Sequence, residues 1–119
     1  MSSIVIHMQH VTCDTLPHFL SANTVVILDF SAAWCGPCRK MEPILESLAD
    51  KVPVAQVDVD ADAELAAQYG VTSIPTIIVT LNGSVHARHV GVVEAPTLMQ
   101  SVNAARQQTM YADTSNTPF

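Results

Sequence analysis

The segment Val25 to Phe30 constrains the fold most, because it is an apolar run without alternating polar residues. Such a run is typical of a strand that is covered on both faces of a sheet. A helix is predicted next, over Cys35 to Lys51, because its apolar residues recur at helical spacing; they are Met41, Ile44, Leu45 and Leu48. A second strand is predicted over Val54 to Val59. This order of strand, helix and strand indicates parallel strands joined by a right-handed crossover.

Other segments with strand or helix signals surround this unit. Strands are predicted over Ile4 to Met8, Thr76 to Leu81 and Ser84 to Val90, and helices over Asp14 to Leu20, Asp60 to Tyr69 and about Ala95 to Gln108. Thr12 is the expected N-cap of the first helix, and Asn82-Gly83 predicts a two-residue hairpin turn. We therefore expect an α/β fold in the order β-α-β-α-β-α-β-β-α, with a central mixed five-stranded sheet flanked by four helices.

The length of 119 residues suits one ordinary domain. Hydrophobic residues make up 49% of the chain and charged residues 13%, a balance that excludes intrinsic disorder. We expect one domain over residues 1–108. Residues 109–119 are polar and lack periodicity, so we expect a flexible C-terminal tail there.

The net charge of −6 has the wrong sign for binding phosphates or anionic lipids. Nucleic acid and membrane surfaces are therefore not expected partners. No apolar run reaches the roughly 18 to 20 residues that span a bilayer, and Met1 to His7 lacks the basic and apolar regions of an export signal. We expect a cytoplasmic protein.

Two of the three cysteines, Cys35 and Cys38, are separated only by Gly36 and Pro37 at the start of a predicted helix. The unpaired N–H groups and the helix dipole at this end favour the thiolate of Cys35. Cys38 lies on the same helical face, so the two sulfurs can form a disulfide without refolding. Because the closed loop is short, the bond adds little stability and suits reversible exchange.

Three other interpretations of this pair remain open. The thiols are inert and buried, or they form a structural disulfide in an exported protein. The third is a zinc site, because His10 and Cys13 supply a second pair of ligands at metal spacing. Against zinc, Pro37 removes a backbone donor, and Arg39 stands where a glycine would follow the second cysteine.

Asp29 is a carboxylate inside the apolar strand. Burial disfavours its charged form and raises its pKa, which enables proton exchange near neutral pH. The alternative is a structural Asp that is paired with another group.

The residues from Asp29 to Cys38, followed by Met41 and Pro43, resemble the thioredoxin family. The dipeptide between the two cysteines resembles the reducing branch of that family. Further family motifs follow in order and spacing over about Val5 to Ala105; they are Val57-Asp58-Val59-Asp60, Tyr69-Gly70-Val71, Ser73-Ile74-Pro75-Thr76, Asn82-Gly83 and Gly91.

The resemblance implies a role for each matching residue. Cys35 would be the exposed nucleophile, Cys38 the resolving thiol and Asp29 the buried carboxylate that accepts and returns protons. Pro75 would be a cis-proline that faces the cysteines, and the backbone of Ile74 would bind an extended client segment. These two residues would belong to a flat apolar patch around the sulfurs, whose other members are Trp34, Gly36, Pro37 and Gly91.

The resemblance also implies a thiol-disulfide oxidoreductase that reduces disulfides in client proteins and is re-reduced by a flavoprotein, thioredoxin reductase. It implies no bound cofactor or metal, since the reductase would consume the NADPH. Expected clients include peroxiredoxins, methionine sulfoxide reductases and ribonucleotide reductase, and we expect a monomer. The alternative from another functional class is a redox-independent binding subunit of a larger complex that uses the same surface.

Three positions depart from the family pattern. Ser31 stands where many bacterial members have Trp. Gln56 stands where many bacterial members have Lys, so Asp29 should be more easily protonated. Cys13 matches no catalytic position. We expect it to be a small buried hydrophobe, with dimer formation or redox regulation as the alternatives.

Overall fold

The structure is a computed structural model that describes residues 8–115. Its elements follow the predicted order of strands and helices: β1 (Met8–His10), α1 (Leu16–Ala22), β2 (Val25–Ser31), α2 (Gly36–Leu48), β3 (Val54–Asp58), α3 (Ala63–Gln68), β4 (Thr76–Leu81), β5 (Ser84–Val90) and α4 (Ala95–Ser115).

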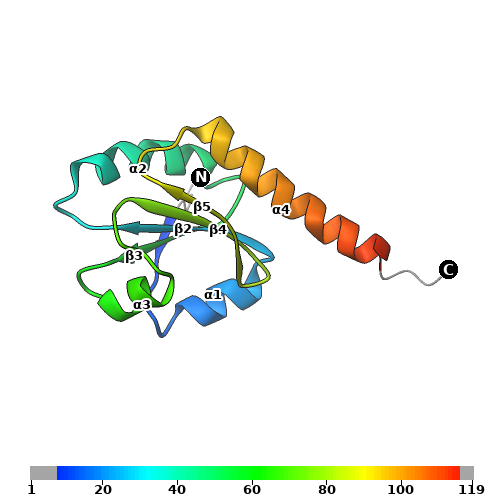
Figure 1. The fold of residues 1–119 in the computed structure, drawn as a ribbon, viewed down its shortest axis with the longest axis horizontal. Coiled ribbons are helices and arrows are strands. Elements are labelled where there is room, and N and C mark those ends of the chain that lie inside the picture. Colours follow the sequence, from blue (N-terminus) through cyan, green and yellow to red (C-terminus); the bar gives the residue numbers. More distant parts are fainter. Residues whose placement is uncertain (1–7, 116–119) are drawn as a thin grey trace, which may run out of the picture.

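The five strands form one mixed sheet in the order β1-β3-β2-β4-β5. β1, β3 and β2 are parallel, whereas β4 pairs antiparallel with β2, and β5 pairs antiparallel with β4. The parallel pairing expected for the two strands joined through α2 is confirmed. So is the α/β fold with a five-stranded sheet flanked by four helices (Figure 1).

Helices cover both faces of this sheet, with α2 and α4 on one side and α1 and α3 on the other (Figure 1). Alternate residues of β2 point toward these two layers. Val25 and Ile27 pack with α2 and α4, while Val26 and Leu28 pack with α1 and α3. All four side chains are buried, which explains the unbroken apolar run in this strand. β2 therefore forms the centre of the core and ends just before the cysteine pair.

The N-terminal elements end later than predicted. β1 (Met8–His10) runs two residues past the predicted end at Met8, and the rest of that predicted strand, residues 4–7, lies outside the described part of the chain. The N-cap position of α1 is Thr15 rather than the predicted Thr12, although the Thr15 side chain makes no capping hydrogen bond and the carbonyl oxygen of Thr12 accepts a hydrogen bond from the N–H of Leu16. The hydroxyl of Thr12 instead accepts a hydrogen bond from the N–H of Asp14 and stabilises the turn before the helix.

The boundaries of the remaining elements show which local signals were decisive. β4 and β5 have the predicted bounds, and both residues of the turn between them, Asn82 and Gly83, have positive φ angles of 52° and 83°. A two-residue hairpin turn of this type requires that conformation. α2 and α3 are each shorter than predicted, as their bounds above show.

The C-terminal helix is longer than predicted. α4 runs to Ser115 instead of ending at Gln108, so the first part of the expected tail is helical, and the helix projects beyond the sheet (Figure 1). Once a helix has formed, each added residue gains one hydrogen bond, so polar residues without periodicity can extend it. The division into a domain over residues 1–108 and a flexible tail over 109–119 stays a prediction.

Candidate active site

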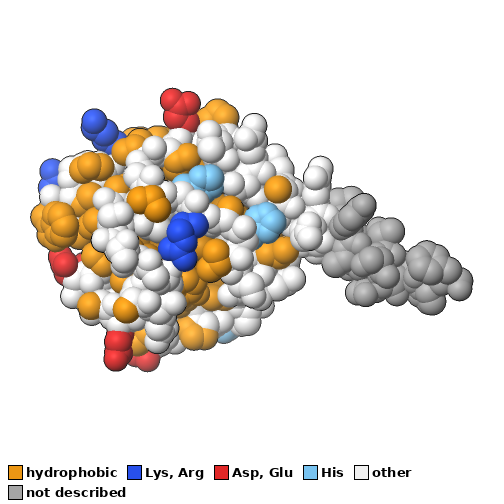
Figure 2. All heavy atoms as spheres, viewed as in Figure 1, with side chains coloured by type: hydrophobic (Ala, Val, Ile, Leu, Met, Phe, Trp, Pro, Cys, Tyr) orange, Lys and Arg blue, Asp and Glu red, His pale blue; other side chains and the backbone are white. Residues whose placement is uncertain are grey.

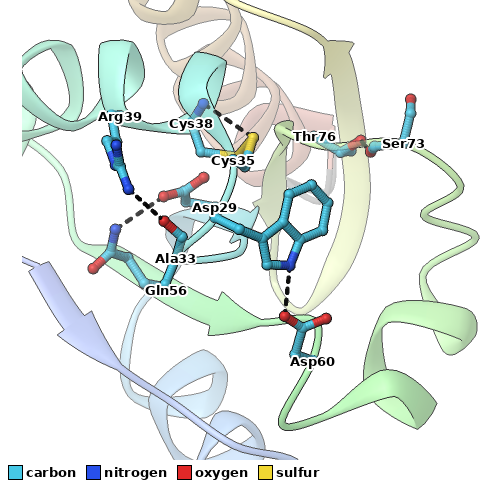
Figure 3. The surroundings of a disulfide bond; sticks show 10 residues. Asp29, Ala33, Cys35, Cys38, Arg39, Gln56, Asp60, Ser73 and Thr76 are labelled. Carbon is cyan, nitrogen blue, oxygen red and sulfur yellow. Dashed lines mark hydrogen bonds between the residues drawn. A yellow bond between two sulfur atoms is a disulfide. The ribbon is translucent and has the colours of Figure 1, made fainter.

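Cys35 and Cys38 form a disulfide at the N-terminus of α2. Their Cα atoms are 5.3 Å apart, within the ordinary range for a disulfide. Cys35 is the N-cap of α2, and its Sγ accepts a hydrogen bond of 3.2 Å from the N–H of Cys38 (Figure 3). Pro37 lies in the first turn, where a missing N–H costs no helical hydrogen bond. The predicted placement of both sulfurs at one helix end is confirmed.

The prediction that Cys35 is exposed was wrong for this disulfide form, since Cys35 and Cys38 are each 4% exposed. Both lie in a small apolar cluster with Ala32, against which Val59 and Ile74 pack. Two of these neighbours come from loops far away in the sequence. Val59 and Ile74 cover Cys35 in the folded chain, and the sequence around Cys35 gives no sign of these two contacts.

Asp29 lies in β2 on the α2 side of the sheet and is 1% exposed. Gln56 of β3 is its partner in register, and Gln56 Nε2 donates a hydrogen bond of 3.0 Å to Asp29 Oδ2 (Figure 3). The Oδ1 atom is buried and has no hydrogen-bond partner among the described residues. Burial raises the pKa of Asp29 from 3.8 to about 6, although the Gln56 hydrogen bond acts in the opposite direction. The expected buried carboxyl group with a raised pKa is therefore present.

Around the disulfide, the predicted surface residues are largely exposed. Trp34 is 67% exposed, and Gly36 and Pro37 are exposed beside it. The indole Nε1 of Trp34 donates a hydrogen bond of 2.7 Å to Asp60 Oδ2, which fixes the ring next to the pair. Sequence reasoning gave Asp60 no role at this site, because no local signal connects it with Trp34.

A second segment of the predicted surface comes from the loop before β4. The Ile74-Pro75 peptide bond is cis, as predicted, and Ile74 packs against the cysteine cluster. Gly91 donates its N–H to the carbonyl oxygen of Pro75 over 2.8 Å and has a φ angle of 92°. The hydrogen bond joins the end of β5 to this loop.

Two apolar residues that sequence reasoning missed flank Gly91: Val90 and Val92 are both large, hydrophobic and exposed. Their position next to Gly91, a predicted member of the surface around the sulfurs, could have identified them as further members of that surface. The face seen in Figure 2 carries hydrophobic side chains among few and scattered charged ones.

The loop between β2 and α2 is held by Arg39. Its guanidinium donates a hydrogen bond of 2.9 Å to the carbonyl oxygen of Ala33 (Figure 3). This contact stabilises the backbone just before Trp34. The position of the two cysteines thus depends on the hydrogen bond that caps α2 and on the contact between Arg39 and Ala33.

Comparisons with known proteins agree with this geometry. A family model described as Thioredoxin matches residues 7–104. The chain belongs to the thioredoxin family. The thioredoxin of Bacillus subtilis is 43% identical over 87 residues, which cover 70% of this chain and 84% of that protein. The thioredoxin of Chlamydia trachomatis is 39% identical over 85 residues, which cover 69% of this chain and 83% of that protein.

Solved structures of thioredoxins share the fold. A mutant thioredoxin from Halobacterium salinarum aligns with a TM-score of 0.80 and 35% identity, covering 83% of this chain and 90% of that chain. Thioredoxin f from spinach chloroplast aligns with a TM-score of 0.76 and 30% identity, covering 89% of this chain and 99% of that chain.

Membership of the thioredoxin family, together with the disulfide at the helix N-terminus, makes this chain a thiol-disulfide oxidoreductase with protein-disulfide reductase activity. Its redox-active group is its own disulfide. The family implies two general kinds of partner, a reductase and proteins that carry disulfides. Nothing in the structure or in these relatives supports the alternative of a redox-independent binding subunit.

The third cysteine of this thioredoxin-family chain lies apart from the site. Cys13 is an exposed free thiol, so the prediction of a buried hydrophobe was wrong. It lies in the turn before α1, and its N–H donates to Asp62 Oδ2 over 2.8 Å. The negative charge of Asp62 is the largest cause that raises the pKa of Cys13, and the charge of Asp14 acts in the same direction. These effects favour the thiol over the reactive thiolate.

The zinc interpretation required His10 and Cys13 to join the cysteine pair. Within residues 8–115, no three His, Cys, Asp or Glu side chains are arranged to hold a metal ion.

Of the helices in that same part of the chain, none is both long and apolar enough to cross a membrane.

Proposed function

We propose that Cys35 is the nucleophile, Cys38 the resolving thiol and Asp29 the group that exchanges protons with Cys38. The observation that carries this proposal is the disulfide at the N-terminus of α2 together with a buried carboxyl group on the same side of the sheet. After reduction, the free N–H groups of the first helical turn stabilise negative charge on Cys35.

The exchange has two steps. The thiolate of Cys35 attacks one sulfur of a client disulfide, forms a mixed disulfide and releases the other client sulfur as a thiolate. The thiol of Cys38 then gives its proton to the ionised Asp29 and attacks the sulfur of Cys35, which releases the second client sulfur. The client gains two electrons, and the pair returns to the disulfide form.

Docking of clients is assigned to the surface around the disulfide. Its members are Trp34, Gly36, Pro37, Ile74, Pro75 and Gly91. An extended client segment would form hydrogen bonds with the backbone of Ile74, as a strand added to a sheet edge does. The exposed ring of Trp34 and its bond to Asp60 support a preformed apolar contact beside the sulfurs.

The proposed physiological role is that of a cytoplasmic electron carrier. Thioredoxin reductase, a flavoprotein, would pass electrons from NADPH to the disulfide. Peroxiredoxins, methionine sulfoxide reductases and ribonucleotide reductase are the proposed clients, and the working form is a monomer.

Reduction of insulin disulfides with dithiothreitol as the electron source tests the proposal. Wild-type protein should accelerate the reduction, Cys35→Ser should return it to the uncatalysed rate, and Cys13→Ser, the matched control, should keep the wild-type rate. A wild-type protein that does not accelerate the reaction, or a Cys35→Ser protein that does, would refute the proposed function.

A further inference from the structure

A cleft of about 330 Å³ opens beside the cysteine pair, between α2 and the edge of the sheet formed by β1. Its walls include Cys38 of α2, Gln56 of β3 and His10 of β1. The cleft has room for several water molecules, since each occupies about 30 Å³ in the liquid. Water that entered it would meet both the resolving cysteine, Cys38, and Gln56, the side chain that binds Asp29.

Three polar side chains form a row across the sheet; His10 and Gln56 line the cleft, and Asp29 lies behind Gln56. His10 pairs in register with Gln56, and Gln56 pairs in turn with Asp29. Residues paired in this way on parallel strands share a face, so all three lie on the α2 side of the sheet. Along the row, His10 is exposed, Gln56 is buried and Asp29 is 1% exposed. The row therefore leads from solvent to the buried carboxyl group.

The inner end of this row must exchange protons if Asp29 acts as proposed. The hydrogen bond from Gln56 orients one carboxyl oxygen, while Oδ1 has no partner among the described residues. A side-chain amide does not titrate near neutral pH, so Gln56 can position Asp29 but cannot carry its proton away. Water, or another side chain together with water, must therefore carry the proton between Asp29 and bulk solvent.

The titratable and charged groups at the cleft are few. α2 contributes Arg39 and Glu42, β3 ends at Asp58, and β1 contributes His10. After burial and the Gln56 hydrogen bond, Glu42 raises and His10 lowers the pKa of Asp29, so both act on it electrostatically. Among these side-chain types, the imidazole can both accept and donate a proton through its two ring nitrogens, as a proton shuttle must.

We propose that His10 is a proton-relay residue that passes protons between Asp29 and bulk solvent through the water of this cleft. The inference rests on the proposed role of Asp29 in the exchange. When Cys38 attacks the mixed disulfide, its proton moves to Asp29. The imidazole of His10 then accepts this proton through water in the cleft and releases it to bulk solvent. Both electrons stay with the disulfide exchange, and the relay transfers the proton alone.

A single-turnover experiment tests the relay. Reduced protein is mixed with an excess of oxidised insulin, and formation of the Cys35–Cys38 disulfide is followed by acid quenching and mass spectrometry. His10→Gln should lower the rate about three- to tenfold near neutral pH, less than the roughly 10²- to 10⁴-fold effect of a direct general acid or base, because water still carries some protons. Imidazole added to the buffer should restore the rate, since it replaces the missing proton carrier.

Two controls separate a relay from a structural effect. His18 is exposed on α1, on the opposite face of the sheet, and His18→Gln should leave the rate unchanged with or without imidazole. In the Asp29→Asn background, His10→Gln should have no further effect, because the relay no longer has a proton to carry.

The outcomes distinguish the relay from the proposed function. If wild-type protein does not react with insulin, both fall. If wild-type protein reacts and His10→Gln or His10→Ala matches it across pH 6 to 9, the relay alone is wrong. A loss of rate that imidazole does not restore, or one that persists in the Asp29→Asn background, also overturns the relay.

Discussion

Burial of Asp29 makes a quantitative prediction about the dependence of stability on pH. The pKa of about 6 in the folded chain, against an ordinary value of 3.8, corresponds to about 3 kcal/mol, at about 1.4 kcal/mol per pKa unit. The folded state binds the proton more tightly than the unfolded state does. The contribution of Asp29 to the free energy of unfolding is therefore fully present below about pH 4 and is lost as the pH rises through about 6.

The Asp29→Asn variant removes this titration while keeping the size of the side chain and an oxygen that can accept the Gln56 hydrogen bond. Subtracting the wild-type free energy of unfolding from that of the variant should give a difference about 2.5 kcal/mol larger at about pH 8 than at about pH 4, where the unfolded carboxyl group is already partly ionised. Comparing two pH values cancels any effect of the substitution that does not depend on pH.

Urea unfolding of the oxidised protein is the suitable assay, because the cysteine pair does not titrate in that form. The matched control is Glu46→Gln, which removes an exposed carboxylate from α2 and should show a nearly constant difference from wild type over the same range. A difference for Asp29→Asn that is also constant with pH would refute the argument that burial keeps this carboxyl group protonated to about pH 6.

Three further substitutions test other parts of the structure. Gln56→Lys should lower the pKa of Asp29, because it places a cation beside the carboxylate; an NMR titration of the Asp29 carboxyl carbon that shows no decrease would contradict this. Gly91→Ala should lower the free energy of unfolding by about 1–2 kcal/mol, because Gly91 has a positive φ angle that alanine adopts only at a cost. An added Cβ meets no atom within 4 Å, so the cost comes from the backbone conformation alone. Urea unfolding that shows no measurable loss would contradict this prediction. Leu98→Ala should cost about 2–5 kcal/mol in the same assay, since this side chain is fully buried between α4 and the sheet, and a loss well below that range would contradict the packing.

The parts of the fold that were predicted well depend on short-range signals. The apolar run at Val25 to Phe30 identified β2, and Asn82-Gly83 identified the turn between β4 and β5. The length of α4 had no such signal, because the residues after Gln108 show neither a periodic apolar face nor a stop such as Gly. Thr12 and Thr15 are the same residue type three positions apart, so the sequence could not decide at which of them the helix begins.

For the site, the sequence predicted the residue types and the pairing but not their surroundings. Cys35 and Cys38 were placed correctly because they lie within one helical turn. The burial of Cys35 depends on Val59 and Ile74, which reach it only in the folded chain. The bond from Trp34 to Asp60 likewise joins two loops, and no periodicity or spacing encodes such a contact.

Capture of a mixed disulfide tests the division of labour between the two cysteines most directly. Cys38→Ser protein, reduced and then incubated with oxidised insulin, should accumulate a covalent adduct that mass spectrometry of a digest assigns to Cys35, because no thiol is left to resolve it. Cys35→Ser protein should form little adduct under the same conditions. An adduct that forms on Cys38 in the Cys35→Ser protein as readily as on Cys35 in the Cys38→Ser protein would contradict the account.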